Sequence, residues 1–378
     1  MNRREDSADP IVAVDAMTAH FPLPAPLLIG DLNIAARDYA FVQVRSAAGY
    51  VGKGYVLSHG FPLDAIINNL FRPILLNKDP SQVVSLWEEC YKSTIAAGRV
   101  GLVMRALSLV DTALWDIKAQ RAGLPLWQLL GGYRVELPVM MVAGYLTEKR
   151  GPDEISEELV RYAEAGYTLL KIARSLDNTS MRRLLGLLLE ALPARCRVVV
   201  DGLWGWRSVA EVEDDLARWE VVPELGHRLA WLEDPFPPEN VQLYRALSRA
   251  VSVPVGVGDD LTDSHAMQFL ISEGCASVAR VDALAIGGVT TALKLMHLAD
   301  MNGVPISPHV CPEVHVHLGA ALPGCLAVEM FDPTGNNLDV SYRFIIGGPK
   351  VSQGNIYAPT VPGLGFDIDW EFVRAHSA

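Results

Sequence analysis

Seven polar side chains between residues 171 and 329 each follow a short apolar run of the sequence. Successive members are 20 to 32 residues apart, which is about the length of one strand and one helix. They are Lys171, Asp201, Glu233, Asp259, Asp282, His309 and Glu329. A single charged residue after a strand is most often a helix cap or a solvated loop residue. Seven in phase favour one shared site, in which carboxylates and an imidazole can combine metal binding with proton transfer.

Three of these carboxylates, Asp201, Glu233 and Asp259, follow consecutive apolar runs. Carboxylates brought together repel one another, and burial strengthens the repulsion unless a cation neutralises them. Oxygen ligands without thiolates or imidazoles favour Mg²⁺. A metal there would hold a substrate carboxylate and stabilise the charge that develops when the α-carbon loses a proton. Lys171 could hydrogen-bond the same carboxylate from the other side.

The apolar runs themselves recur through the chain, and a helical pattern follows each of them. They span residues 139–143, 167–170, 197–200, 229–232, 253–257, 276–281, 304–307 and 326–328. Strand-like runs that alternate with helices indicate βαβ units and a parallel sheet, and eight of them favour a closed barrel. A doubly wound sheet would need a Gly-rich phosphate loop after its first strand, and residues 143–147 are a poor candidate. In a barrel the C-terminal strand ends share one face, so the seven side chains would converge.

The first part of the chain has a different pattern. Residues 11–14, 39–45 and 50–56 alternate like strands, and the proline-rich segment 21–26 is predicted to be a loop. Between Val103 and Ile117 the apolar residues recur every three or four positions, as on one face of a helix. Residues 1 to about 130 therefore predict a small α+β unit of a short antiparallel sheet followed by helices.

The composition bounds the class of protein. The chain has 378 residues, half of them apolar and a fifth charged, which is a normal globular balance. Its net charge of -12 argues against nucleic acid or an anionic membrane as the main partner. No apolar run is long enough for a membrane span, and the first seven residues do not suggest a secretory signal. Five cysteines without a close-spaced pair suit reduced thiols, so we expect a cytoplasmic enzyme or binding protein.

The chain resembles members of the enolase superfamily, in the mandelate racemase subgroup, over nearly its whole length. The similarity is carried by residues 106–131, 231–235, 281–290 and 306–309. The resemblance implies an N-terminal α+β capping domain over 1–132, a modified TIM barrel, (β/α)7β, over 133–350, and a C-terminal segment, 351–378, that packs back on the capping domain. It also implies one essential Mg²⁺, abstraction of the proton α to a carboxylate, and a homo-oligomer between a dimer and an octamer.

The resemblance also assigns roles to the seven residues. Asp201, Glu233 and Asp259 match the metal ligands, and Asp260 is the nearest competitor for the third position. His309 matches the catalytic base, Asp282 its dyad partner, and Glu329 a group that supports the substrate carboxylate or enolate.

Substrate selection is expected from the capping domain and the barrel rim, with Phe21, Tyr55 and Trp204 as candidate contacts. Trp204 could equally well pack the rim of the barrel. Leu203 replaces a residue that is polar in the family, which removes one polar contact.

The main departure from the family is the absence of a second lysine. The subgroup usually has Lys-x-Lys, whereas this chain reads Lys171-Ile172-Ala173. Because strand side chains alternate, Lys171 and Ala173 should face the pocket, and alanine cannot transfer a proton. Arg174 could replace it only by curling in from the strand end, and an arginine stays protonated and is a poor base. One face of the substrate therefore has no obvious acid–base residue.

This asymmetry favours dehydration over racemisation. One histidine can remove the α-proton and protonate a hydroxyl that leaves from the same face, whereas racemisation needs proton donors on both faces. We therefore predict a Mg²⁺-dependent lyase that converts a sugar acid to a 2-keto-3-deoxy acid. A racemase or epimerase with its second base elsewhere, and a metal-binding relative without catalysis, are the alternatives.

Overall fold

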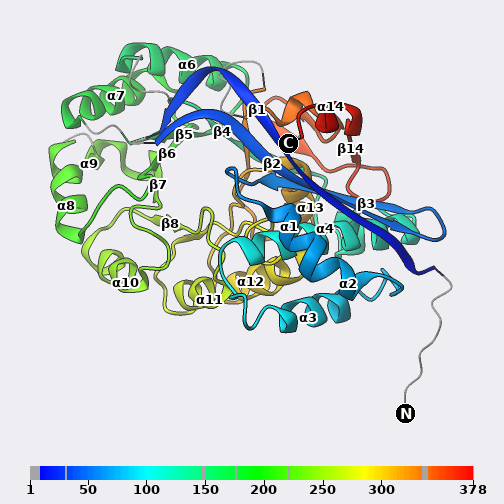
Figure 1. Ribbon diagram of the computed structural model, residues 1–378. Helices are drawn as coiled ribbons and strands as arrows, with labels where there is room; N and C mark the ends of the chain where they lie inside the picture. The colour runs from blue at the N-terminus through cyan, green and yellow to red at the C-terminus, as the bar shows by residue number, and fades with distance from the viewer. Residues whose placement is uncertain are drawn as a thin grey trace.

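The computed structural model describes residues 9–29, 32–145, 150–174, 177–219, 222–333 and 339–377. Two large hydrophobic cores account for the layout. One lies in and around a mainly parallel barrel, and the other joins an antiparallel sheet to the helices beside it. Figure 1 shows the long strands of this sheet crossing beside the barrel. The predicted fold class, a modified TIM barrel with an N-terminal α+β capping domain, is confirmed.

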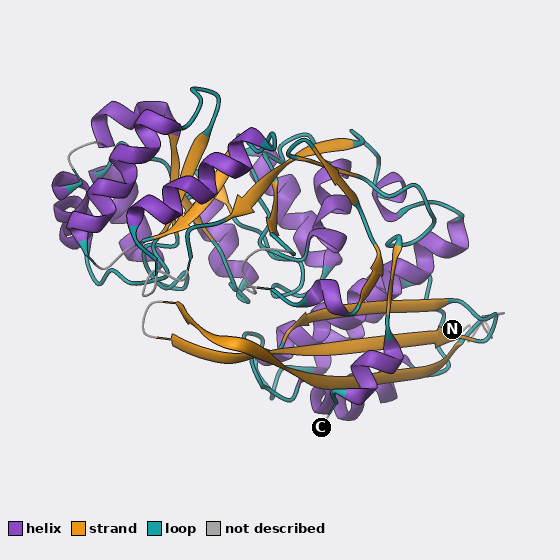
Figure 2. Ribbon diagram, turned by 90° about the horizontal axis from the view of Figure 1, so that it is seen from above, coloured by secondary structure: helices purple, strands orange, loops and turns teal. Residues whose placement is uncertain are grey.

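The capping sheet consists of β1 (Ile11–Ile29), β2 (Leu32–Ser46) and β3 (Val51–Leu57), paired antiparallel in that order. The proline-rich segment was predicted to be a loop, and this prediction is wrong, because β1 runs through it. The prolines instead interrupt the ladder, since the β1–β2 register shifts between Pro22 and Leu27. The β1–β2 hairpin reaches across to the mouth of the barrel (Figure 2).

Helices pack against this sheet and connect it to the barrel. They are α1 (Leu63–Ile66), a π-helical turn (Ile67–Phe71), α2 (Arg72–Leu75), α3 (Val83–Ser93), α4 (Leu102–Ala122) and α5 (Leu126–Leu129). The long helix α4 ends at Gly123 in the left-handed conformation, as a glycine C-cap does. Gly52 of β3 lets α4 approach closely, because a Cβ there would lie 2.0 Å from the carbonyl oxygen of Ala113.

The barrel strands follow the predicted runs. They are β4 (Glu136–Val142), β5 (Leu169–Ala173), β6 (Arg197–Asp201), β7 (Leu229–Glu233), β8 (Val255–Val257), β9 (Val278–Ala279) and β10 (Val328–Phe331). Strands β4 to β9 pair in parallel in sequence order, and β10 pairs with β4. The run at 304–307 contributes single bridges, in which Ile306 pairs with Ala279 and with Cys325, so the ring closes there.

The helices of the barrel unit lie around the ring of strands (Figure 1). They are α6 (Pro152–Glu164), α7 (Asn178–Ala191), α8 (Val209–Arg218), α9 (Val222–Leu225), α10 (Val241–Ala250), α11 (Ser264–Ser272), α12 (Val289–Met301) and α13 (Pro312–Ala321), with a short 3₁₀ turn at Gly226–Arg228. Within the described residues, no helix is long and apolar enough to cross a membrane.

The C-terminal part of the chain contacts both units. The hairpin of β12 (Lys350–Ser352) and β13 (Asn355–Tyr357) adds to β4, while β11 (Ile345–Gly347) pairs with β14 (Phe366–Ile368). Residues of β14 and of α14 (Trp370–Ala375) are buried in the capping core, and a short 3₁₀ turn spans Ser341–Arg343. The boundaries 1–132, 133–350 and 351–378 stay predictions.

Candidate active site

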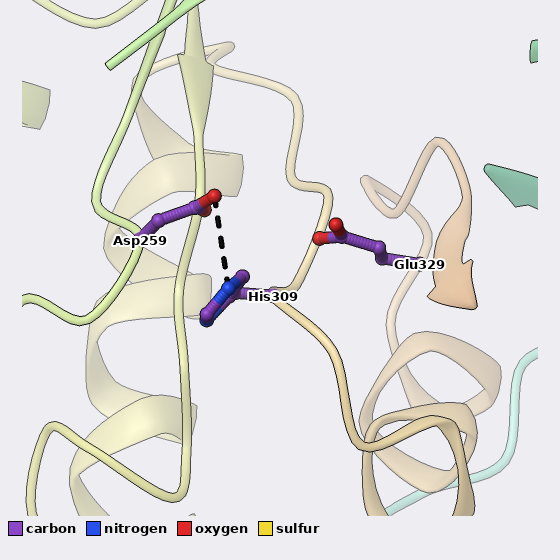
Figure 3. A group of neighbouring side chains, drawn as sticks. All are labelled: Asp259, His309 and Glu329. Carbon is purple, nitrogen blue, oxygen red and sulfur yellow. Dashed lines mark ion pairs between the residues drawn. The ribbon is translucent and has the colours of Figure 1, made fainter. Parts of the chain in front are cut away.

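The structure brings the seven predicted residues to the C-terminal ends of the barrel strands. Ligand atoms of Asp201, Glu233 and Asp259 all lie within 4.8 Å of one another. A second group of Asp259, His309 and Glu329 meets the same limit, and Figure 3 shows their side chains turned toward a common space. Asp282 lies behind His309, and Lys171 lies among the carboxylates. The parallel strands therefore produce the convergence that their spacing predicts.

Tight turns after the strands fix the carboxylates. Leu203 and Trp204 both adopt positive φ, of 52° and 54°, and the Leu203 amide donates to Asp201 Oδ1 at 2.9 Å. After β8, Gly258 has a φ of 131°, and a Cβ there would lie 2.5 Å from the carbonyl oxygen of Arg280. Backbone conformations of this kind persist only where the surroundings hold them, and they are typical of functional sites.

The ammonium of Lys171 lies at the centre of the carboxylates. Its Nζ is 3.0 Å from Asp201 Oδ2 and 3.1 Å from both Asp259 Oδ2 and Glu329 Oε1, and it also contacts Glu233. Burial lowers the pKa of Lys171, but the surrounding carboxylates outweigh it and hold that pKa well above the usual range. Lys171 is therefore a fixed positive charge that can bind a carboxylate and is a poor base.

Glu233 is buried among other carboxylates and two cations. Its side chain is fully buried, with Oε1 against the ammonium of Lys171 and Oε2 against the guanidinium of Arg280. Burial raises its pKa well above the usual range and Asp259 and Asp201 raise it further, while Arg280 and Lys171 lower it. A divalent cation would offset the remaining negative charge and favour the ionised form. The three carboxylates therefore fit a metal with oxygen ligands.

His309 and Asp282 form the predicted pair. His309 Nδ1 is 3.1 Å from Asp282 Oδ2, while Oδ1 of the same carboxylate accepts from the Leu284 amide at 2.8 Å. Nε2 of the imidazole is 3.7 Å from Asp259 Oδ2, the ion pair dashed in Figure 3. Burial lowers the pKa of His309, but the neighbouring carboxylates, led by Asp259, outweigh it and raise that pKa to about 10. Asp282 thus orients the imidazole and favours its protonated form.

Asp260 does not join the three carboxylates. Its Oδ1 accepts from Nη2 of Arg105, on α4 of the capping domain, at 2.6 Å and lies 4.0 Å from His309 Nδ1. Burial raises the pKa of Asp260, but Arg105 and His309 outweigh it and hold that pKa below the usual range. Asp260 therefore ties the capping domain to the edge of the site, and Asp259 is the better third ligand.

The opposite side of the site is mainly apolar. Ala173 packs with Val142 and Tyr145 in a small buried cluster that Leu203 and Phe331 also contact. Arg174 does not curl into the pocket, because its guanidinium bonds Asp215 at 2.8 Å and stacks over Trp206. Among the described residues of this cluster, Tyr145 is the one whose side chain can lose a proton.

Two functional side chains escaped the sequence patterns. The hydroxyl of Tyr145 donates to Asp201 Oδ2, and the fully buried guanidinium of Arg280 lies against Glu233 and Asp259. Arg280 did leave a signal, because an arginine inside an apolar run predicted to be a buried strand needs buried anionic partners. Tyr145 left none, since its partner is 56 residues away.

Two predicted substrate contacts lie elsewhere. Phe21 is fully buried and stacks on Phe344 and Phe372 in the capping core, so it has no surface to offer a ligand. Tyr55 is also buried, and its hydroxyl donates to Glu313, which joins the capping sheet to α13. Phe21 was predicted to lie in a loop, whereas the structure places it in β1 and in the core. For Trp204 the predicted contact stays a prediction.

Comparisons with known proteins agree with this architecture. Residues 13–131 match the family described as mandelate racemase / muconate lactonizing enzyme, N-terminal domain, and residues 154–372 match the enolase C-terminal domain-like family. Arabinonate dehydratase of Saccharolobus solfataricus is 26% identical over 342 residues, which cover 86% of this chain and 87% of the relative. D-galactarolactone cycloisomerase of Agrobacterium fabrum is 26% identical over 378 residues, covering 95% and 96% of the two chains.

A solved relative is similar over the whole fold. The crystal structure of L-talarate dehydratase from Polaromonas sp. JS666, complexed with Mg and L-glucarate, matches with a TM-score of 0.87 at 27% identity. The match covers 98% of each chain. Both units of this chain therefore have counterparts in one known protein.

Proposed function

The chain belongs to the mandelate racemase / muconate lactonizing enzyme family of the enolase superfamily, and from this premise we propose that it dehydrates a sugar acid to a 2-keto-3-deoxy acid. It is an enzyme with Mg²⁺ as cofactor, in keeping with the L-talarate dehydratase complexed with Mg. The dehydratase assignment also draws on relatives such as arabinonate dehydratase.

A single observation carries the proposal, namely the asymmetry of the site. His309 and its partner Asp282 lie on one side, whereas on the other Ala173 packs with Val142 and with Tyr145, whose phenol donates to Asp201. Racemisation needs a proton donor on each face of the α-carbon. Dehydration needs one base and one acid, and a single imidazole can supply both in turn when the α-proton and the hydroxyl leave from the same face.

The proposed roles follow from the contacts. Asp201, Glu233 and Asp259 would hold Mg²⁺, which when bound neutralises charge that develops on the substrate carboxylate. Lys171 and Glu329 lie beside these ligands, and Lys171 would hydrogen-bond that carboxylate.

His309 Nε2 would take the α-proton and return it to the leaving hydroxyl on the adjacent carbon, so that water departs. The resulting enol would then become the 2-keto-3-deoxy acid by a proton shift. For the first step the imidazole must be neutral, whereas Asp259 and the other carboxylates hold its pKa at about 10. A cation that cancels the charge of Asp259 would bring that pKa down toward the working range of a base.

The test is an NMR screen of hexonates, pentonates and aldarates with Mg²⁺ in D₂O. The proposal expects a keto-deoxy product, with deuterium exchange at the α-carbon only where that carbon's proton faces His309. Two labelled diastereomers without a keto product would support an epimerase instead. Binding of sugar acids without any turnover would support a relative that has lost catalysis.

A further inference from the structure

Arg280 lies directly after β9 and underneath the carboxylates of the candidate site, with a fully buried side chain. Its Nε is 2.9 Å from both Glu233 Oε2 and Asp259 Oδ1. Its Nη2 donates to Oε2 of Glu329. One guanidinium therefore contacts two of the proposed metal ligands and the carboxylate beside them.

The remaining nitrogen of Arg280 bonds the segment that carries the proposed base. Nη1 donates to the carbonyl oxygens of Ser307, at 2.7 Å, and Pro308, at 3.1 Å. These carbonyls immediately precede His309 in the chain. The planar fork of a guanidinium can satisfy all these acceptors at once, which the single ammonium of a lysine cannot do.

Four carboxylates and two cations share this buried cluster. The carboxylates are Asp201, Glu233, Asp259 and Glu329, and the cations are Lys171 and Arg280. A guanidinium does not lose its proton in proteins. With the four carboxylates ionised and His309 neutral, as the proposed base must be, the cluster keeps two negative charges, which one divalent cation neutralises. Without the charge of Arg280 it would keep three.

Arg280 and Lys171 also connect Glu329 to the proposed metal ligands. Oε2 of Glu329 accepts from Arg280, and its Oε1 accepts from Lys171 at 3.1 Å. The same two cations contact Oε2 and Oε1 of Glu233. Glu329 therefore belongs to the same charge cluster as the proposed ligands.

We propose that Arg280 is a positioning residue that aligns Glu233 and Asp259 as ligands and sets the charge of the ion that the site accepts. The inference rests on the proposed function in one respect, the assignment of the three carboxylates as metal ligands, and it holds whichever acid is the substrate.

The experiment compares the affinities of the full chain for Mg²⁺ and Tb³⁺, the first by titration calorimetry and the second by luminescence competition. Arg280→Gln removes one positive charge and so makes the cluster more negative by one unit. The Tb³⁺/Mg²⁺ affinity ratio should then rise at least about tenfold, because the trivalent ion gains more from the added negative charge than the divalent ion does. At a few ångströms and the effective dielectric constant of a protein, the interaction energy of that one extra unit of ion charge exceeds the energy of a tenfold change. Glu329→Gln removes one negative charge, and the ratio should fall by a similar factor.

Two charge-conserving variants serve as controls. In the double variant R280Q/E329Q, and in Arg280→Lys, the ratio should stay within about threefold of wild type, although both affinities fall because the alignment is poorer. If R280Q does not fold, E329Q and the double variant still test the charge rule, because their shifts are predicted independently. Circular dichroism verifies that each variant is folded.

The outcomes separate this inference from the function itself. The charge-setting role would be overturned if the Tb³⁺/Mg²⁺ affinity ratio stayed constant. In R280Q this would mean that both affinities fall in parallel, and in E329Q that both stay unchanged. If the ratio is constant among the variants but the wild type binds Mg²⁺, the charge-setting role fails and the proposed metal site still holds. A wild type that binds neither ion would overturn the metal site and this inference together.

Discussion

At the scale of single residues, chemistry in this site depends on His309 and on the absence of a counterpart at Ala173. The imidazole touches Asp282 through Nδ1 and turns Nε2 toward the carboxylates, while the methyl group of Ala173 lies in an apolar cluster. A proton can therefore be exchanged on one side of the substrate.

Replacing His309 by Asn should remove α-proton exchange and turnover together, each by at least about 100-fold, since general base catalysis contributes that much or more. Deuterium incorporation followed by NMR measures the first, and product formation measures the second. Asp282→Asn, which keeps the imidazole but changes its partner, should slow both while leaving exchange detectable. Exchange at the wild-type rate in the His309 variant would reveal another base.

Tyr145→Phe should weaken Mg²⁺ binding by about tenfold, because the phenol donates to Asp201 and groups that orient a ligand affect metal affinity by roughly that factor. Titration calorimetry measures the change. The control is Tyr162→Phe, which removes a comparable hydrogen bond to Asp332, at 2.8 Å, away from the three proposed ligands. Equal affinities in both variants would contradict the prediction.

At the scale of elements, helix α4 of the capping domain contacts α12, the helix after the loop that carries Asp282. Asp111 on α4 accepts from the backbone amide of Thr290, at 2.8 Å, and from its hydroxyl, at 2.7 Å. Thr290 is in the first turn of α12, so a carboxylate from one domain caps a helix of the other. The loop between Asp282 and α12 is therefore fixed from outside the barrel.

This contact predicts a pH dependence of stability. Burial raises the pKa of Asp111 to about 7, against the bonds from Thr290 that lower it. The folded state then binds the proton more tightly than the unfolded state, so the contribution of Asp111 is full below about pH 4 and is lost as the pH rises to about 7. The stability of wild type relative to Asp111→Asn should therefore decline by about 1.4 kcal/mol per pH unit over that range.

Denaturant unfolding of wild type and Asp111→Asn from pH 4.5 to 8, with saturating Mg²⁺, measures this difference. Asp214→Asn is a matched control, because Asp214 forms an exposed ion pair with Arg218, and such pairs contribute little to stability. A pH-independent gap between wild type and Asp111→Asn would disprove the prediction.

At the scale of the whole molecule, the proposed metal joins strands that are far apart in the sequence. The carboxylates come from β6, β7 and the end of β8, and Arg105 of the capping domain bonds the neighbouring Asp260. A cluster with excess negative charge opposes the closure of the barrel mouth until a cation neutralises it.

Chelation of the metal with EDTA should lower the melting temperature by several degrees and abolish turnover, because an ion that binds the folded state alone stabilises it. Differential scanning calorimetry with and without Mg²⁺ measures the shift. Glu233→Gln should bind Mg²⁺ more weakly and lose most of the response to EDTA. A melting temperature that does not depend on Mg²⁺ would remove the metal from this account.

The sequence by itself determined the barrel, the seven strand-end positions and the inward direction of Ala173. These properties depend on local periodicity and on the repeat of strand plus helix, which place side chains of parallel strands on one face. The pairs of Tyr145 with Asp201 and Arg280 with Glu233, and the burial of Phe21, were decided by the tertiary structure alone. They depend on packing between elements that are distant in the chain, and no local pattern encodes which distant side chain fills a given buried space.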